Sequence, residues 1–438
     1  MSSFRPGRLI GILVGTVVIL GLGVYGPAVL LGPLPAVTAT TVTPAAGAFA
    51  PTPPVLSANG ASAIAVLAAT TSDASGTTST GTTSTGATST GTVSQAAEPI
   101  AVAGTAEALP MASIAKVVTA LVVLDAKPIA DGDSGPVVTL TAADFQSYLD
   151  YDQVGARSVT VFADEQWTEL ELLQALLLGS SNNHADSVAR WAFGSLDAYV
   201  EAANAWLADN GLTGSAVVDA TGLGDGSAGT ATDLARLAGL AATDPIVSSI
   251  LERPASALAD RRGVENTTSF LPEEGITGIS RSYTDAAGVC FLFTAKVSDG
   301  ASSFTFSGAF IGEPTYDALT ADLTALMESA RAGVGPLPVL AAGDEYATFE
   351  SAWGDEASAV VGVSRTRYAW QAATPEAATV TLKDFATART GANVGEVRLT
   401  VAGEELSAAL KLDQAINNPG LGWRLLHPIV MITALLDQ

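Results

Sequence analysis

A long apolar stretch near the N-terminus most constrains how this chain folds. Residues 9–31, LIGILVGTVVILGLGVYGPAVLL, carry no charge, and a helix rising about 1.5 Å per residue crosses a hydrocarbon core over this length. Arg5 and Arg8 precede the stretch, and no charged residue follows it until Asp73. This asymmetry predicts a single-pass transmembrane anchor in the cell membrane, with residues 1–8 cytoplasmic and the rest of the chain extracytoplasmic. A cleaved signal peptide is the alternative.

The composition excludes several classes of function. The 438 residues include 20 Lys and Arg against 44 Asp and Glu, a formal charge of −24, so nucleic acid is not an expected partner. The single Cys290 cannot form an intrachain disulfide. With only His184 and His427, zinc fingers and His-rich metal sites are excluded, and a Ser–His–Asp triad nearly so. Nucleophilic chemistry therefore requires a Ser, Thr or Cys whose base is not histidine.

Beyond the anchor, the pattern predicts a linker and two folded domains. Residues 32–56, rich in Pro, Ala and Thr, are typical of an extended linker. Residues 57–335 mix strand-like and helix-like runs, which indicates an α+β domain. Within it the Gly/Thr/Ser repeat at 70–94 offers no apolar face and is expected to be a disordered loop. Residues 336–438 contain short β-like runs with turn signals between them, which predicts a small C-terminal β domain and tail.

Individual elements of the α+β domain follow from periodicity. Strands are expected near 62–69, 98–104, 289–297 and 302–312. Helices are expected from 113, from 168, over 197–209, from 230 and over 318–332.

A serine and a lysine lie three residues apart at the start of the first of these helices. Positions i and i+3 share one helix face, so the Ser113 hydroxyl and the Lys116 amine can meet. A helix N-terminus favours the alkoxide and the oxyanion that develop during acyl transfer. Apolar neighbours such as Val117 desolvate the lysine, which lowers its pKa and lets it act as a base. The alternative is a helix-capping serine beside a surface lysine.

A cluster of small polar side chains ends the next helix. Ser180 and Asn182 lie in the run Leu-Leu-Gly-Ser-Ser-Asn-Asn, where a hydroxyl and an amide can point into a cleft. The alternative is a helix C-terminal turn with local hydrogen bonds.

These two motifs together resemble those of the low-molecular-mass penicillin-binding proteins of the serine β-lactamase-like superfamily. The resemblance is closest to the D-alanyl-D-alanine carboxypeptidases, in which Ser-x-x-Lys is followed about 65 residues later by Ser-x-Asn. DATGL at 219–223, TATDLARLA from 230 and the Asn266-Thr-Thr run also match. The resemblance covers about residues 57–331 and implies a penicillin-binding α+β domain, with the C-terminal β domain similar to the second domain of these enzymes.

The third motif of the family departs from the expected Lys-Thr-Gly. In Gly-Ile-Ser-Arg-Ser-Tyr-Thr, at 278–284, Ser280, Arg281 and Ser282 occupy those three positions. Arg281 keeps a cation, but strand alternation directs it to the face opposite Ser280. The flanking Tyr283 and Thr284 complete the substrate-binding strand that the resemblance implies, with a backbone N–H near Tyr283 as an oxyanion donor. His184 follows the second motif, where a partly exposed helical histidine is expected.

The resemblance implies a serine-type D-Ala-D-Ala carboxypeptidase, a hydrolase without metal or organic cofactor. Ser113 is then the nucleophile, Lys116 its base, Ser180 a proton relay and Asn182 a ligand of the substrate amide. Peptidoglycan stem peptides are the implied substrates and β-lactams the implied acylating ligands. Two alternatives stay open: a membrane-tethered pseudoenzyme that binds stem peptides or a cell-wall partner, and a β-lactamase or esterase.

Overall fold

The computed structural model describes residues 15–16, 23, 25–44, 52–72, 78–82, 99–130, 132–252, 262–299, 302–370, 378–401 and 404–436. The chain divides into two compact units. The larger unit comprises Ala50–Pro336 and Tyr368–Ala372, and the smaller one comprises Met1–Phe49, Leu337–Arg367 and Ala373–Gln438. The chain thus leaves the larger unit after Pro336 and returns to it briefly at 368–372.

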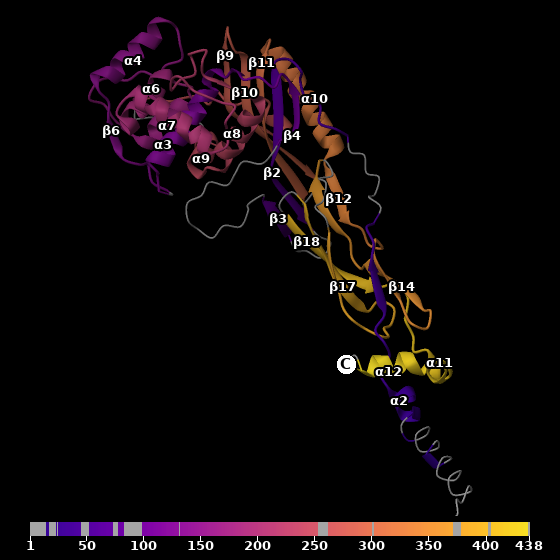
Figure 1. Cartoon of the computed structure of the whole chain (residues 1–438). Helices are drawn as coiled ribbons and strands as arrows, with labels where there is room; N and C mark the ends of the chain where they lie inside the picture. Colours follow the sequence, from indigo (N-terminus) through magenta and orange to yellow (C-terminus); the bar gives the residue numbers. More distant parts are fainter. Residues whose placement is uncertain are drawn as a thin grey trace, which may run out of the picture. The chain divides into compact units, whose positions relative to one another are not determined.

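The larger unit is built on one antiparallel sheet with the strand order β3-β2-β11-β10-β9, in which β4 also pairs with β2 (Figure 1). The strands are β2 (Ala61–Ser72), β3 (Thr78–Thr82), β4 (Pro99–Gly104), β9 (Ile276–Thr284), β10 (Gly288–Asp299) and β11 (Ser302–Glu313). The four expected strands are therefore present, as β2, β4, β10 and β11. Strand β9, which carries the third motif, lies at an edge of the sheet.

One face of this sheet packs against α10 (Tyr316–Gly333). Alternate residues of β10 and β11 are aromatic, so they project to one face and form a buried cluster with Leu319, Leu323 and Trp370. The rings of Phe306 and Trp370 lie 5.4 Å apart, and the Trp370 indole donates a 3.0 Å hydrogen bond to the carbonyl of Thr52. This packing explains why residues 368–372 belong to the larger unit.

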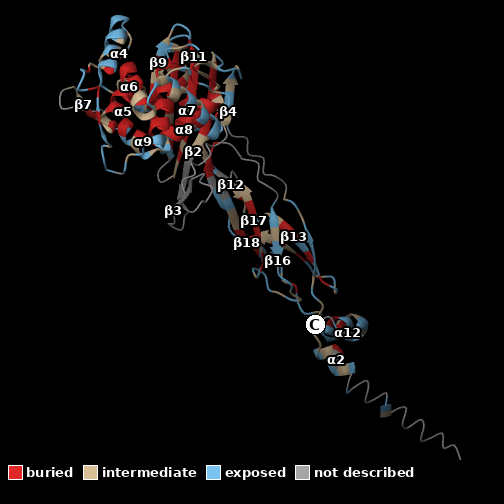
Figure 2. Cartoon of the chain, turned by 60° about the vertical axis from the view of Figure 1, so that its left-hand side comes forward, coloured by how far each residue is buried: buried red, intermediate tan, exposed pale blue. Residues whose placement is uncertain are grey.

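The other face of the sheet adjoins a cluster of helices (Figures 1 and 2). These helices are α3 (Ala115–Ala126), α4 (Ala142–Gln153), α5 (Glu169–Leu177), α6 (Asn182–Phe193), α7 (Leu196–Asp209), α8 (Ala231–Thr243) and α9 (Pro245–Glu252). Ten consecutive residues of α3, from Ala115 to Leu124, are buried, because this helix is apolar on all sides and lies within the cluster. The capping box predicted at Thr168 is present at the start of α5. The α+β prediction for this domain is confirmed.

The prediction of a disordered loop at 70–94 is wrong for residues 78–82. These residues form β3, which pairs with the extended end of β2 in the register Thr71↔Ser79. The physical reason is that threonine is β-branched and that an extended Thr-rich segment satisfies its backbone groups on the open edge of β2. Residues 73–77 and 83–98 lie outside the described residues.

The smaller unit contains a six-stranded antiparallel sheet with the order β1-β13-β14-β18-β17-β16. Its strands are β1 (Thr38–Thr41), β13 (Glu345–Glu350), β14 (Glu356–Val361), β16 (Thr379–Leu382), β17 (Asn393–Val401) and β18 (Glu404–Leu412). Strands β12 (Gly335–Leu340) and β15 (Arg365–Ala369) pair separately. The expectation that residues 32–56 form only an extended linker is wrong at β1, which pairs with β13. Its β-branched threonines extend the sheet edge.

The C-terminal segment of the smaller unit is helical. Helices α11 (Gly420–Leu426) and α12 (Pro428–Leu436) pack on α2 (Gly26–Leu31), and Arg424 donates hydrogen bonds to the carbonyls of Leu30 and Gly32. Most of the predicted anchor at 9–31 lies outside the described residues. Among those that are described, no single helix is long and apolar enough to cross a membrane, although α8 and α9, bent by 85° at their junction, reach that length and hydropathy together.

Candidate active site

Ser113 lies in a tight turn at the start of α3. The turn is the 3₁₀ segment Ala112–Ile114, and Ala112 has a φ of +47°, in a region that non-glycine residues rarely adopt. Backbone strain of this kind persists only where surrounding contacts enforce it, and it is concentrated at functional sites. The turn sets the Ser113 hydroxyl at the N-terminus of a buried helix, as the Ser-x-x-Lys motif predicts.

Lys116 joins this serine to a second segment of the chain. Its Nζ donates one 2.8 Å hydrogen bond to Ser113 Oγ and another to the carbonyl of Thr221. The side chain is only 2% exposed, and this burial lowers its pKa from 10.5 to about 7, against the opposing charge of Asp219. The positive charge of Arg157 lowers the pKa further. Near neutral pH a large fraction of Lys116 is therefore the free amine.

The loop that supplies the Thr221 carbonyl is held by a carboxylate. Asp219 accepts hydrogen bonds from the backbone N–H groups of Thr221, Gly222 and Gly224. Gly222 has a φ of +77°, and a Cβ at this position would lie 1.8 Å from the carbonyl oxygen of Ala112. Only glycine fits there, so the loop presses directly against the Ser113 turn. In the sequence this loop stands out only through the family resemblance, and no local pattern there signals that it orients Lys116.

Ser180 lies beside the Ser113–Lys116 pair. The two serines and the lysine line one narrow pocket together with Val117, Leu176, Leu177, Thr267, Thr268, Ile279, Ser280 and Arg281. Ser180 has a φ of +51°, and its Oγ is buried without a hydrogen-bond partner in the described part of the chain. A buried hydroxyl left unpaired is costly unless a ligand or a reacting group uses it.

Asn182 begins α6 and does not line this narrow pocket. Its Oδ1 is buried and, among the described residues, has no hydrogen-bond partner, while its backbone N–H donates to the carbonyl of Arg157 at 2.9 Å. The structure therefore brings Ser113, Lys116 and Ser180 together in one pocket. Asn182, two residues after Ser180, lies outside the pocket lining, and among the described residues its amide oxygen has no hydrogen-bond donor.

The third-motif strand β9 forms another wall. Ser280 is buried in the pocket lining, and Ser282 is also buried, with no partner for its Oγ among the described residues. Arg281 points to the opposite face, as strand alternation predicts: its guanidinium lies 5.2 Å from the Phe270 ring and 5.7 Å from the Tyr316 ring. The lysine position of the motif thus holds a neutral hydroxyl.

The last two residues of β9 do not line the pocket. Tyr283 is 54% exposed and donates its hydroxyl to Asp285, while Thr284 Oγ1 accepts from the N–H of Ala287. Because β9 is an edge strand of its sheet, its outward backbone groups have no strand partner there. An extended peptide can add to the sheet at this open edge.

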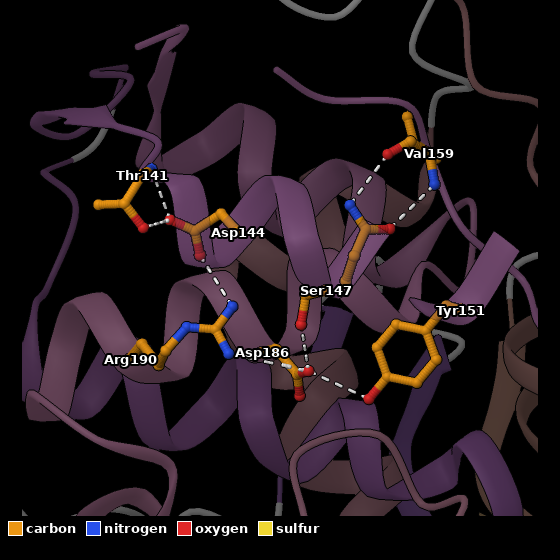
Figure 3. A network of polar contacts seen from close by, with 8 residues as sticks. Thr141, Asp144, Ser147, Tyr151, Val159, Asp186 and Arg190 are labelled. Atoms are coloured by element: carbon orange, nitrogen blue, oxygen red, sulfur yellow. Dashed lines mark hydrogen bonds and ion pairs between the residues drawn. The ribbon is translucent and has the colours of Figure 1, made fainter. Parts of the chain in front are cut away.

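A partly buried network of polar side chains links α4 to α6 near the site (Figure 3). The hydroxyls of Ser147 and Tyr151 on α4 both donate to Asp186 Oδ2 on α6, at 2.8 and 3.1 Å. On the same two helices, Arg190 forms a 2.9 Å ion pair with Asp144. Burial raises the pKa of Asp186, whose charge in turn raises the pKa of Lys116. The spacing of these residues along the chain gave no signal that they converge.

His184 is fully buried, so the expectation of a partly exposed histidine is wrong. Its Nδ1 lies 2.8 Å from Ser181 Oγ, and its ring centroid lies 4.8 Å from that of Trp167. Burial lowers its pKa to about 3, so the ring is neutral at physiological pH. His184 does not line the pocket. Its burial results from the packing of α6 against Trp167, which sequence periodicity does not encode.

No metal-binding arrangement exists in the described ranges, where no group of three or more His, Cys, Asp or Glu side chains could hold an ion. Cys290, on β10, is buried, and desolvation raises the pKa of its thiol to about 12.

Two solved structures that share this fold are penicillin-binding proteins. Penicillin binding protein 5 from Haemophilus influenzae matches with a TM-score of 0.54 and 18% sequence identity, over 84% of this chain and 99% of that chain. Penicillin binding protein 6B from Escherichia coli matches with a TM-score of 0.54 and 16% identity, over 83% and 97%. At such identities the likeness shows the fold alone, which is the mixed α/β fold of the penicillin-binding class.

The sequence identifies the family within that class. Residues 81–302 match the peptidase S11 family, described as D-alanyl-D-alanine carboxypeptidase, over just over half of the chain. The protein belongs to this family, and the resemblance drawn from its motifs is confirmed.

Two curated relatives are named D-alanyl-D-alanine endopeptidase. The one from Pseudomonas aeruginosa is 27% identical over 209 residues, which are 46% of this chain and 64% of the relative. The one from Escherichia coli is 25% identical over 243 residues, 53% and 73% of the two chains. The chain therefore spans slightly less than two thirds of the length of the first of these relatives.

Proposed function

We propose that this protein is a serine-type D-Ala-D-Ala carboxypeptidase that acts on peptidoglycan stem peptides through an acyl-enzyme on Ser113. The observation that carries the proposal is the contact of Ser113 Oγ with Lys116 Nζ, an amine whose pKa burial brings to about 7. A neutral amine at hydrogen-bond distance from a hydroxyl is a general base ready to activate that nucleophile. Membership of the carboxypeptidase family supports the choice of substrate.

The reaction uses the residues in a fixed order. Lys116 accepts the proton of Ser113, and Ser113 Oγ forms an ester with the carbonyl carbon of the penultimate D-alanine. As the C–N bond breaks, Ser180 Oγ gives its proton to the leaving amine of the terminal D-alanine and takes the proton that Lys116 holds, so Lys116 becomes a free amine again. Water then hydrolyses the ester: it loses a proton to Lys116 as it attacks the carbonyl carbon, and that proton returns to Ser113 Oγ as the ester bond breaks. The Ser113 N–H at the start of α3 and a backbone N–H near Tyr283 stabilise the oxyanion, while Asn182 holds the peptide amide.

A second candidate function is binding without efficient turnover. The observation in its favour is the neutral Ser280 at the lysine position of the third motif, together with the side chain of Ser282 where the family has glycine. In this case the pocket binds stem peptides or a cell-wall partner, and β-lactams acylate Ser113 slowly if at all.

Labelling with a fluorescent penicillin, followed by an assay of D-alanine release from a D-Ala-D-Ala peptide, distinguishes the two candidates. The protein is expected to label covalently and to release D-alanine, and Ser113→Ala is expected to abolish both. Ser195→Ala serves as the matched control, because Ser195 caps α7 away from the pocket. Labelling that survives in Ser113→Ala contradicts the assigned nucleophile. Peptide binding without release of D-alanine supports the second candidate.

We further propose that residues 9–31 anchor the protein in the cell membrane, with residues 1–8 cytoplasmic and the peptidase domain outside. Arg5 and Arg8 on the short side support this orientation. The exposed apolar side chains of α11 and α12, which pack on the end of this segment, also favour an apolar environment: Leu421, Leu425, Leu426, Ile429, Ile432, Leu435 and Leu436. Fractionated cells are expected to retain the full-length chain in alkali-washed membranes. Recovery of the uncleaved chain in the wash contradicts the anchor.

A further inference from the structure

Two arginines converge on one threonine of the pocket wall. Arg157 Nη1 donates a hydrogen bond to Thr267 Oγ1 at 3.2 Å, and Arg281 Nε donates to the Thr267 carbonyl, also at 3.2 Å. Thr267 lines the pocket together with Ser113 and Ser180. Two arginines from separate segments of the chain therefore contact one residue of the pocket wall, Arg157 through the Thr267 side chain and Arg281 through the Thr267 carbonyl.

Among the described residues, neither of these arginines has a carboxylate partner. Other arginines there do form ion pairs with acidic side chains, among them Arg190, Arg262, Arg331 and Arg398. Within the described ranges, no carboxylate lies at ion-pair distance from Arg157 or Arg281, although the chain carries a net charge of −24. A guanidinium group without a counter-ion is a ready partner for an anionic ligand.

The backbone that carries Arg157 is fixed against the second motif. The Arg157 carbonyl accepts the N–H of Asn182 at 2.9 Å. Two residues further on, the N–H and carbonyl of Val159 pair with the side chain of Asn183 at 3.1 and 2.9 Å (Figure 3). The backbone that carries the exposed Arg157 side chain is thus fixed by hydrogen bonds, which reduces the conformational entropy lost when the guanidinium binds a ligand.

Arg157 also lies close enough to the reaction centre to act on it electrostatically. Its charge lowers the pKa of Lys116, whereas Ser280 contributes no charge to the pocket and the Arg281 guanidinium stacks on the opposite face of β9. Of the two arginines, Arg157 is therefore the one whose charge acts on the pocket.

We propose that Arg157 binds the terminal carboxylate of the peptide substrate, in place of the cation missing at Ser280. The inference rests on the proposed peptidase function and deepens it: a guanidinium that recognises a carboxylate through paired N–H donors selects peptides with a free C-terminus. The site then favours a carboxypeptidase substrate over an internal peptide bond, which distinguishes this chain from relatives named endopeptidases.

The test is equilibrium binding to the full-length Ser113→Ala protein, which needs no turnover. Isothermal titration compares acetyl-Lys-D-Ala-D-Ala with its C-terminal carboxamide. The free acid is expected to bind roughly 10- to 100-fold more tightly, the range of a charge-assisted hydrogen-bonded pair. Adding Arg157→Gln is expected to remove this preference, whereas Arg365→Gln, an exposed arginine in the smaller unit, is the charge-matched control and is expected to leave it unchanged.

Several outcomes overturn the inference: equal affinity for the two peptides, no binding of the free acid, or a preference that survives Arg157→Gln. The proposed function is judged separately, by D-alanine release from the protein with Ser113 intact. A protein that releases D-alanine but binds acid and carboxamide equally keeps its function and loses the carboxylate site. A preference for the acid in a protein that never releases D-alanine supports the site and contradicts the peptidase.

Discussion

Replacing Lys116 with methionine is expected to slow the acylation of Ser113 by penicillin by roughly 10²–10⁴-fold, the contribution of a positioned general base. Methionine has a similar length and is apolar, so it fills the buried space without a charge to desolvate. The amine that contacts Ser113 Oγ at 2.8 Å is lost. The rate of labelling by a fluorescent penicillin measures the effect. Lys127→Met, at the exposed C-terminus of the same helix, is the control and is expected to label normally.

The same base sets the pH dependence of acylation in the natural protein. Because burial lowers the pKa of Lys116 to about 7, the active free amine dominates above that pH and is protonated below it. The labelling rate is therefore expected to rise with pH and to reach a plateau, with a midpoint near 7. A midpoint near 10, the ordinary lysine value, or a Lys116→Met variant that labels at the normal rate, contradicts the assignment of the base.

Replacing Gly222 with alanine is expected to destabilise the larger unit by roughly 3–5 kcal/mol, because strain at a positive φ is added to a steric clash. The new Cβ would lie 1.8 Å from the Ala112 carbonyl oxygen, so the loop and the Ser113 turn must separate. The Thr221 carbonyl moves with the loop, and a displacement of about 1 Å in such a constellation costs about 10² in rate. Chemical denaturation and penicillin labelling measure the two effects.

The control variant Gly211→Ala separates the effect of backbone strain at a positive φ from the effect of a steric clash. Gly211 has a similar φ of +72°, yet nothing lies within 4 Å of its Cβ position. Its replacement is expected to cost only the left-handed backbone penalty of about 1–2 kcal/mol and to leave labelling intact. Equal effects of the two substitutions would show that the contact between the loop and the Ser113 turn does not matter.

Sequence patterns located most of the peptidase domain because its elements carry local signals. The helix at 113–125 and the strands at 289–297 and 302–312 are long, periodic and bounded by turn residues. The predictions were wrong at β1 and β3, where short Thr-rich segments have neither periodicity nor an apolar face. Each of these strands forms because it pairs with the open edge of another strand. For β1 that strand is β13, which is distant in the sequence, and for β3 it is the preceding strand β2.

The sequence by itself determined that the Ser113 hydroxyl meets the Lys116 amine, because these residues are one helical turn apart and their contact depends only on local geometry. It also determined that Arg281 faces away from Ser280, since alternation along a strand is a local property. Only the tertiary structure decided that the Thr221 carbonyl orients Lys116, that His184 is fully buried, and that Arg157 reaches Thr267. Those contacts join segments separated by many residues, and their existence depends on packing that no local pattern encodes.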